Sequence, residues 1–293
     1  MVADRLYERI ASCGPVCFGL DTAASYLPPG LTAKAGGDAA GILAFNQALI
    51  DATHDAVACY KVQIAYYEAL GLAGLDAYAK TLAHVRAKGV PVIGDVKRGD
   101  IAATGGQYAK AHFQGDFEAD WITVNPYMGH DAIQPFLELA DQADKGIFVL
   151  VRTSNPGAAD FEYLTVDDGR REPLYLRVAS RVAEMARASR GAHGYSRVGA
   201  VTGCTQRSEV AAVRDALAGC FLLIPGYGAQ GGTAEDVAEY LVGGNGGVVN
   251  ASRSLLLAWK KVDGGAERFA EASREATLQM RADIAAAVAA KGA

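Results

Sequence analysis

Eight short apolar runs, helical patterns between them and glycine clusters after the last two runs predict an α/β fold. Each run has the length and composition of a strand buried on both faces. Strands that alternate with helices indicate a parallel sheet, and eight is the number at which such a sheet closes into a barrel. The predicted architecture is therefore a (β/α)8 TIM barrel with an extra C-terminal helix.

The individual elements follow from the apolar spacing. The expected strands are residues 15–21, 58–64, 90–96, 121–126, 146–153, 196–203, 221–226 and 247–252. Apolar residues recur at helical spacing in residues 74–89, which end in Gly89, and again in 131–143 and 235–242. An open doubly wound sheet is the alternative, but its phosphate-binding glycines usually follow the first strand. Here the first run ends in FGLD, without a GxGxxG pattern.

No linker or second domain is evident, so residues 1–293 are expected to form one barrel domain. Residues 264–290 form a final amphipathic helix that is expected to pack on the barrel or on a second subunit. Its apolar stripe consists of Phe269, Ala272, Ala276, Met280 and Ile284. Residues 152–175 are long for a strand-to-helix connection, and long loops at this end of a barrel tend to cover the site.

Composition narrows the class of protein. Hydrophobic residues make up 51% of the chain and charged residues 21%, which excludes a disordered chain. The net charge of -5 and the absence of a basic stripe make nucleic acid an unexpected partner. The first residues lack the pattern of a signal peptide, and no apolar stretch is long enough to cross a membrane. Five cysteines without a CxxC pair predict reduced, buried thiols and a cytoplasmic location.

Polar groups at the carboxyl ends of the strands are the candidate active groups, because barrels of this type hold their chemistry there. They are Asp21, Lys61, Asp95, Lys97, Asn125, Ser154, Thr205, Gln230 and Arg253, with Asp100 just beyond Lys97. No spacing of histidines or other side chains indicates a metal site, so none is expected.

The stretch DVKRGD is the densest of these groups. Side chains alternate along a strand, so Asp95 and Lys97 should share a face, with Lys61 on the neighbouring strand. Two carboxylates about 4 Å apart repel by about 4 kcal/mol at an effective dielectric of about 20. A lysine between them relieves this repulsion and stays protonated, which suits a proton donor. For Asp100, a helix N-cap is the alternative role.

Two glycine-rich segments, PGYGAQGG and GGNGGVVNASRS, surround the last two strands. Their backbone N–H groups can approach a phosphate, and a following helix N-terminus would add a favourable dipole. Arg253 can fork onto phosphate oxygens. Plain tight turns are the alternative interpretation.

These motifs resemble those of the orotidine 5′-phosphate decarboxylase family. The resemblance rests on Lys61, on Asp95-x-Lys97-x-x-Asp100-Ile101-x-x-Thr104, and on RTSNPGA, PGYGAQGG and NASRS, which resemble its longer bacterial branch. It covers about residues 15–257. It implies a homodimeric (β/α)8 barrel that decarboxylates orotidine 5′-phosphate to uridine 5′-phosphate (UMP) in de novo pyrimidine biosynthesis, without a metal or organic cofactor.

The resemblance also implies roles for individual residues. Asp21 and Lys61 would hold the ribose hydroxyls, Asp95 would face the substrate carboxylate, and Lys97 would deliver a proton to C6. A second group would reach into the partner subunit's site: Asp100, Ile101 and Thr104. Ser154, or Asn155 in its place, would contact the pyrimidine, Gln230 would bridge phosphate and base, and Arg253 would bind phosphate. The remaining expected substrate-binding residues are Asn125, Pro225, Gly228 and Ser252.

Two other functions remain open. Sister enzymes on the same barrel, a hexulose-phosphate synthase or a ketogulonate-phosphate decarboxylase, use a similar Asp-x-Lys-x-x-Asp motif but need Mg²⁺. A non-catalytic phosphonucleotide-binding barrel would show a broken charged array, whereas the array here is intact.

Overall fold

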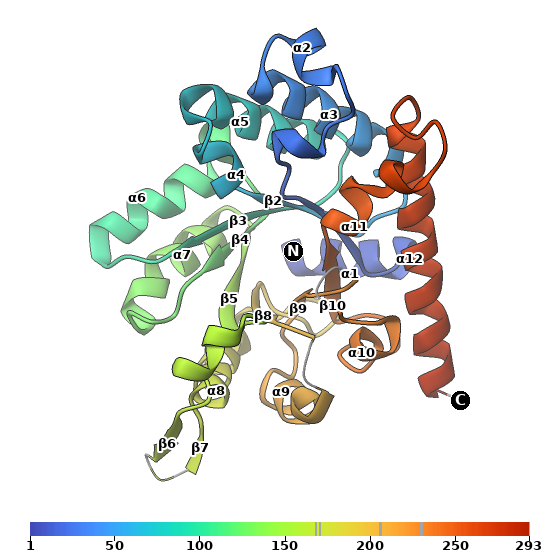
Figure 1. The fold of residues 1–293 in the computed structure, drawn as a ribbon. Helices are drawn as coiled ribbons and strands as arrows, with labels where there is room; N and C mark the ends of the chain where they lie inside the picture. The colour runs from blue at the N-terminus through green and yellow to red at the C-terminus, as the bar shows by residue number, and fades with distance from the viewer. Residues whose placement is uncertain (168, 170, 205–206, 229–230, 293) are drawn as a thin grey trace.

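The computed structural model describes residues 1–292 except 168, 170, 205–206 and 229–230. Eight parallel strands form a closed barrel in the spatial order β1-β10-β9-β8-β5-β4-β3-β2 (Figure 1). They are β1 Val16–Leu20, β2 Cys59–Gln63, β3 Val92–Arg98, β4 Trp121–Val124, β5 Gly146–Arg152, β8 Val198–Thr202, β9 Leu222–Pro225 and β10 Gly247–Ala251. Each strand falls within or next to one predicted apolar run, so the predicted fold is confirmed.

A helix follows each barrel strand and covers its outer face (Figure 1). These helices are α3 Asp38–Thr53, α5 Gly71–Ala87, α6 Ala102–Phe113, α7 His130–Gln142, α8 Leu174–Ala186, α9 Val210–Ala216, α10 Ala234–Ala238 and α11 Arg253–Leu256. Two shorter helices, α2 Leu31–Ala35 and α4 Ala65–Glu68, lie in the connections after β1 and β2. The apolar residues of the strands are buried on both faces, which explains why the runs are nearly continuous in the sequence.

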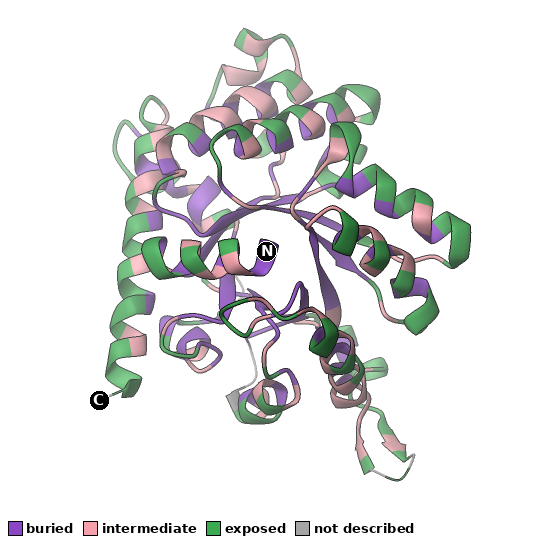
Figure 2. Cartoon of the chain, turned by 180° about the vertical axis from the view of Figure 1, so that it is seen from behind, coloured by how far each residue is buried: buried purple, intermediate pink, exposed green. Residues whose placement is uncertain are grey.

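Helix α1, Val2–Cys13, closes the amino-terminal end of the barrel. Figure 2 shows it lying across this opening. Its residues Leu6 and Ile10 pack in one cluster with Trp121, Phe148 and Phe221, whose rings fill the barrel interior. This plug leaves the carboxyl ends of the strands as the open mouth.

The C-terminal helix α12, Phe269–Gly292, packs on α3 and α10 of the same chain. Ala272, Met280 and Ile284 of its predicted stripe are buried, and the Phe269 ring stacks on Phe45 at 5.0 Å. Arg274 adds an ion pair to Asp55 at 2.5 Å. None of the helices that the structure describes is long and apolar enough to cross a membrane.

The long connection after β5 differs from the expectation that it covers the mouth. Its antiparallel strands, β6 Thr165–Asp167 and β7 Arg171–Pro173, form a hairpin that projects beside α8 away from the barrel (Figure 1). Glu162 holds the start of this connection, because its carboxylate accepts both the N–H and the hydroxyl of Thr153, at 2.9 and 2.7 Å. Of the part of this connection that the structure describes, residues 153–155 line the chambers at the mouth.

Candidate active site at the barrel mouth

Asp95, near the end of β3, is the centre of the site. Each of its carboxylate oxygens accepts one charged and one neutral hydrogen bond. Oδ1 accepts from Lys97 Nζ at 2.6 Å and from Thr123 Oγ1 at 2.9 Å. Oδ2 accepts from Lys61 Nζ at 3.0 Å and from Gln63 Nε2 at 2.9 Å. This carboxylate is buried, and four donors fix its orientation.

The charged groups alternate in sign across the mouth. Lys61 Nζ also lies 2.9 Å from Asp21 Oδ1, so the order is Asp21, Lys61, Asp95, Lys97. Within one chain, the second carboxylate of this array is therefore Asp21. Because two anions and two cations alternate, each buried charge has an opposite neighbour.

The geometry holds the two most buried groups in their charged forms. Burial alone would raise the pKa of Asp95, but Lys61 and Lys97 hold this pKa well below its usual range. Burial alone would lower the pKa of Lys61, but Asp21 and Asp95 hold it above its usual range. Lys61 is therefore an ammonium ion at neutral pH and not a Schiff-base nucleophile.

Asp95 and Lys97 meet for a reason different from simple strand alternation. The pairing of β3 with β4 shifts between Gly94 and Arg98, which marks a bulge. Lys97 has a φ of 46°, in the left-handed region that residues other than glycine seldom adopt. The bulge, and not the regular pleat, brings the Lys97 ammonium to the Asp95 carboxylate.

Asp21 is held from the opposite side by Ser252, whose hydroxyl donates to Asp21 Oδ2 at 2.9 Å. Ser252 occupies the space where a side chain at residue 19 would lie. A Cβ added at Gly19 would come within 2.0 Å of Ser252 Oγ, so a larger residue there would displace this hydroxyl. This contact adds a side-chain link just beyond the ends of β1 and β10, which already pair along their backbones.

Two connected chambers open at the mouth. The apolar chamber has a volume of about 250 Å³ and is lined by Lys61, Asp95, Lys97, Thr123, Leu150, Thr153, Ser154, Asn155, Val201, Leu223, Pro225 and Asn250. The polar chamber has about 330 Å³ and is lined by Asp21, Tyr26, Lys61, Tyr66, Asp95, Pro225, Gly226, Tyr227, Asn250, Ser252 and Arg253. They share Lys61, Asp95, Pro225 and Asn250, so part of the charged array borders both chambers.

The glycine-rich segments border the polar chamber. Arg253 begins α11 and lines this chamber, and Gly228 lies nearby, with its Cβ position 3.6 Å from Ser254. Helix α11 has only four residues, so the expected contribution of a helix dipole is small. Gln230 and Thr205, which the sequence also nominates, lie outside the described residues.

Four nominated residues lie apart from the chambers of their own chain. Ile101 and Thr104 are exposed, and Ile101 has an exposed fraction of 51%. Asp100 Oδ1 accepts the N–H of Ile101 at 2.8 Å. The N-cap residue of α6 is Ile101, and its side chain makes no capping hydrogen bond. Asp100 is therefore not the N-cap of this helix. Asn125 is exposed and accepts the N–H of Tyr127 at 3.0 Å.

Several residues at the site were not nominated from the sequence. Gln63 and Thr123 donate to Asp95, and Asn250 lines both chambers. Gln63 lies two positions after Lys61 on the same strand, a spacing that places both on one face. That spacing was an available signal for Gln63. No comparable sequence signal indicates Thr123, because its role depends on the bulge in the neighbouring strand.

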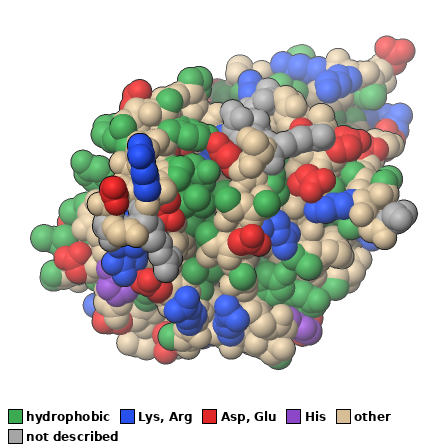
Figure 3. Space-filling model, turned by 90° about the horizontal axis from the view of Figure 1, so that it is seen from below, with side chains coloured by type: hydrophobic (Ala, Val, Ile, Leu, Met, Phe, Trp, Pro, Cys, Tyr) green, Lys and Arg blue, Asp and Glu red, His purple; other side chains and the backbone are tan. Residues whose placement is uncertain are grey.

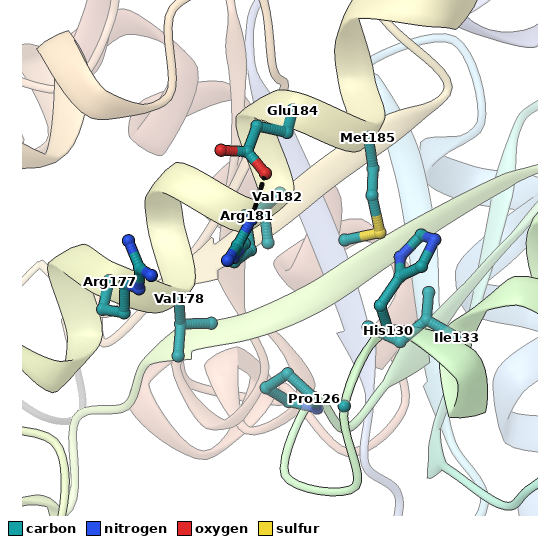
Figure 4. A pocket seen from close by; sticks show the side chains of 10 residues that line it. Pro126, His130, Ile133, Arg177, Val178, Arg181, Val182, Glu184 and Met185 are labelled. Carbon is teal, nitrogen blue, oxygen red and sulfur yellow. Dashed lines mark hydrogen bonds and ion pairs between the residues drawn. The ribbon is translucent and has the colours of Figure 1, made fainter. Parts of the chain in front are cut away.

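A separate hollow of about 640 Å³ lies outside the barrel, between α7 and α8 (Figure 4). Its wall is mainly apolar, with Ile133, Val178, Val182 and Met185, and an ion pair joins Arg181 to Glu184 at 2.8 Å. His130, which the sequence left without a ligand role, also lines it. None of the nominated polar residues that the structure describes lines this hollow, so the mouth remains the candidate site.

One face of the molecule outside the mouth carries charges of both signs. Acidic and basic side chains are intermixed on the face seen in Figure 3, without a continuous basic stripe. All five cysteines are buried and none forms a disulfide. Within the described parts of the chain, no three His, Cys, Asp or Glu side chains come together as a metal-binding group.

A closed parallel barrel with this alternating array at the carboxyl ends of its strands is typical of a (β/α)8 enzyme. Residues 14–265 match the model of the orotidine 5′-phosphate decarboxylase / HUMPS family, and the chain belongs to this family. An orotidine 5′-phosphate decarboxylase of Clostridium perfringens is 51% identical, over 98% of this chain and 99% of its own length.

Solved structures agree with this assignment. The chain matches the crystal structure of a Streptomyces avermitilis protein with a TM-score of 0.83 and 31% identity, over 98% of this chain and 96% of the other. It matches the OMP decarboxylase of Leishmania donovani with a TM-score of 0.69 and 30% identity, over 94% of this chain and 98% of the other.

Proposed function

We propose that the mouth of the barrel binds orotidine 5′-phosphate and that the chain, as a carboxy-lyase of pyrimidine biosynthesis, converts it to UMP and CO₂. The observation that carries this proposal is the array in which Lys61 and Lys97 flank the buried carboxylate of Asp95. Family membership and relatives at about half identity support the same reaction. Residues 1–293 act together as one barrel domain.

The two chambers fit the two ends of such a nucleotide. The pyrimidine would lie in the apolar chamber against Leu150, Val201 and Leu223, with Ser154 or Asn155 beside its polar edge. The phosphate would lie in the polar chamber, near Arg253 and the backbone of Gly226 to Gly228. The ribose would then pass Asp21 and Lys61, which lie between these ends.

The reaction needs one group that destabilises the bound substrate carboxylate and one group that supplies a proton. The bond from C6 to the carboxylate breaks, CO₂ leaves, and the electron pair stays on C6 in the plane of the ring. The Lys97 ammonium stabilises this charge and then donates its proton to C6. Solvent restores that proton, so the sum is substrate plus H⁺ giving UMP plus CO₂.

Asp95 would face the substrate carboxylate and raise the energy of the bound substrate. Repulsion of about 4 kcal/mol at about 4 Å corresponds to about three decades of rate. This term is relieved as CO₂ departs. The remaining acceleration comes from the preorganised Lys97 and from phosphate binding. The binding energy of the phosphate offsets the cost of orienting the substrate at the reacting carbon.

We further propose a homodimer with shared sites. Three residues do not reach the chambers of their own chain: Asp100, Ile101 and Thr104. At the same edge of the barrel, the apolar side chains of Tyr127 and Met128 are exposed. Exposed apolar side chains of this size favour burial against another surface. Such a dimer would bring the partner's Asp100 to the array.

Buried thiols fit a reducing, cytoplasmic compartment.

The Mg²⁺-dependent sister reaction is the alternative within the same family description. The half-identical relatives favour the orotidine phosphate reaction, and the lysines already balance the carboxylates that would otherwise bind Mg²⁺.

A direct assay tests the proposal. Purified protein is mixed with orotidine 5′-phosphate, and its loss is followed by ultraviolet absorbance. We expect stoichiometric formation of UMP and CO₂. An inactive but folded protein that binds UMP would instead support a phosphonucleotide-binding barrel without catalysis.

A further inference from the structure

Thr123, on β4, forms a hydrogen-bond junction directly beneath the charged array. Its Oγ1 accepts the backbone N–H groups of Val96 and Lys97 at 3.0 and 2.9 Å. The same hydroxyl donates to Asp95 Oδ1 at 2.9 Å. A threonine hydroxyl offers one donor and two acceptor sites, so all three are used. The side chain is only 1% exposed.

The junction compensates for the bulge in β3. Gly94 pairs with Ile122 and Arg98 with Val124, so the three residues Asp95 to Lys97 face Thr123 alone. Such an insertion removes ladder partners from backbone groups, and a buried N–H without a partner is costly. The Thr123 hydroxyl supplies the acceptor that the β4 backbone does not.

The junction also explains how Lys97 keeps its unusual backbone. A non-glycine residue with a φ of 46° persists only where its surroundings hold it. Thr123 holds Lys97 through the backbone N–H and holds Asp95 through the carboxylate, while Lys97 Nζ reaches the same carboxylate oxygen at 2.6 Å. One side chain thus fixes the two groups relative to each other.

We propose that Thr123 is a positioning residue for the decarboxylation, which sets the Lys97 ammonium and the Asp95 carboxylate in their reactive arrangement. This inference rests on the roles proposed above for Asp95 and Lys97. Thr123 acts through these two groups and not on the reacting atoms. It should therefore affect turnover much more than nucleotide affinity.

Three substitutions separate the hydroxyl from the shape of the side chain. Thr123→Val keeps the shape but removes the hydroxyl, and Thr123→Ser keeps the hydroxyl. Thr202→Val is the matched control, because Thr202 lies on β8, is 1% exposed, and its Oγ1 has no hydrogen-bond partner among the described residues. Thr202 lines neither chamber.

The readouts are kcat for orotidine 5′-phosphate and, separately, the Kd of UMP by calorimetry. We expect Thr123→Val to lower kcat by about 100-fold, since misplacement by about 1 Å can have that effect. The Kd of UMP should change by less than about threefold, because UMP lacks the carboxylate that faces Asp95. Thr123→Ser should recover most of kcat, and Thr202→Val should change neither quantity.

The inference is overturned if folded Thr123→Val retains kcat within about threefold of the original chain, or if its UMP affinity falls as much as kcat. If this variant does not fold, Thr123→Cys replaces it, because a thiol is only a weak donor and acceptor. Equal kcat values for the Cys and Ser variants would then overturn the inference. Lys97→Ala in the same assay separates the claims: an active Lys97→Ala variant refutes the proposed role of Lys97 itself.

Discussion

Lys97 Nζ lies 2.6 Å from Asp95 Oδ1 although only one residue separates them and the Lys97 backbone is left-handed. This contact joins the proposed proton donor to the proposed source of ground-state stress. Because Lys61 holds the other oxygen of the same carboxylate, neither lysine can move without changing the charge balance of the array.

A mixture of two inactive variants tests whether sites are shared between subunits. We expect Lys97→Ala and Asp100→Ala proteins each to be inactive alone. After subunit exchange, one site in each mixed dimer would contain both Lys97 and the partner's Asp100. Random pairing would then restore about a quarter of the original activity. Absence of recovery, after exchange is verified by mass spectrometry of tagged subunits, would contradict a shared site.

Removal of divalent metal distinguishes the two reactions of this family. The alternating charges leave Asp21 and Asp95 bound to lysines, so we expect turnover of orotidine 5′-phosphate to be unchanged after dialysis against EDTA. Turnover is measured before chelation, after it, and after Mg²⁺ is added back. Loss of activity on chelation with recovery on Mg²⁺ would favour the sister reaction.

Gly19→Ala tests the contact between Asp21 and Ser252. The added Cβ would displace the Ser252 hydroxyl from Asp21, so we expect a KM about tenfold higher, with a smaller effect on kcat. Ser252→Ala should raise KM in the same way. If both act through one contact, the double variant should be little worse than Ser252→Ala alone. Fully additive effects would show that Gly19 acts elsewhere.

The ion pair between Arg274 and Asp55 predicts how docking of α12 depends on pH. The Arg274 guanidinium lowers the pKa of Asp55 to about 2. A carboxyl group whose pKa is lowered by folding stabilises the fold above its unfolded pKa, and this contribution is lost as the pH falls toward the folded pKa. The pair is largely exposed, so Asp55→Asn should reduce the free energy of unfolding by only about 0.5 kcal/mol at pH 7.

Urea unfolding of both proteins at a series of pH values checks this prediction. The difference between Asp55→Asn and the original chain should be constant from pH 7 to about pH 5 and should shrink below pH 4. A difference that grows on acidification would mean that Asp55 stabilises the fold in its protonated form.

Sequence patterns were sufficient for the barrel because each strand is an apolar run buried on both faces and each helix carries periodic apolar residues. They were also sufficient to nominate Asp21, Lys61, Asp95 and Lys97, since strand ends meet at one mouth. The ion pairs among these residues come from the structure, and their catalytic roles stay predictions.

Other features depended on contacts between segments that are distant in the sequence. The plug formed by α1 buries Leu6 and Ile10 against rings from three separate strands. The bulge at Lys97 is accompanied by hydrogen bonds to Thr123 of the next strand, and pleat alternation alone does not predict this bulge. In the connection after β5, Glu162 accepts two hydrogen bonds from Thr153, and no sequence pattern indicates these contacts.

The most direct test of the central claim is a pair of measurements on Lys97→Ala. Turnover of orotidine 5′-phosphate is measured together with the Kd of UMP, in a variant shown to be folded by circular dichroism. We expect turnover to fall below detection while the Kd of UMP changes by no more than about tenfold, because the phosphate and ribose contacts remain. Turnover close to that of the original chain would contradict the assignment of Lys97 as the proton donor.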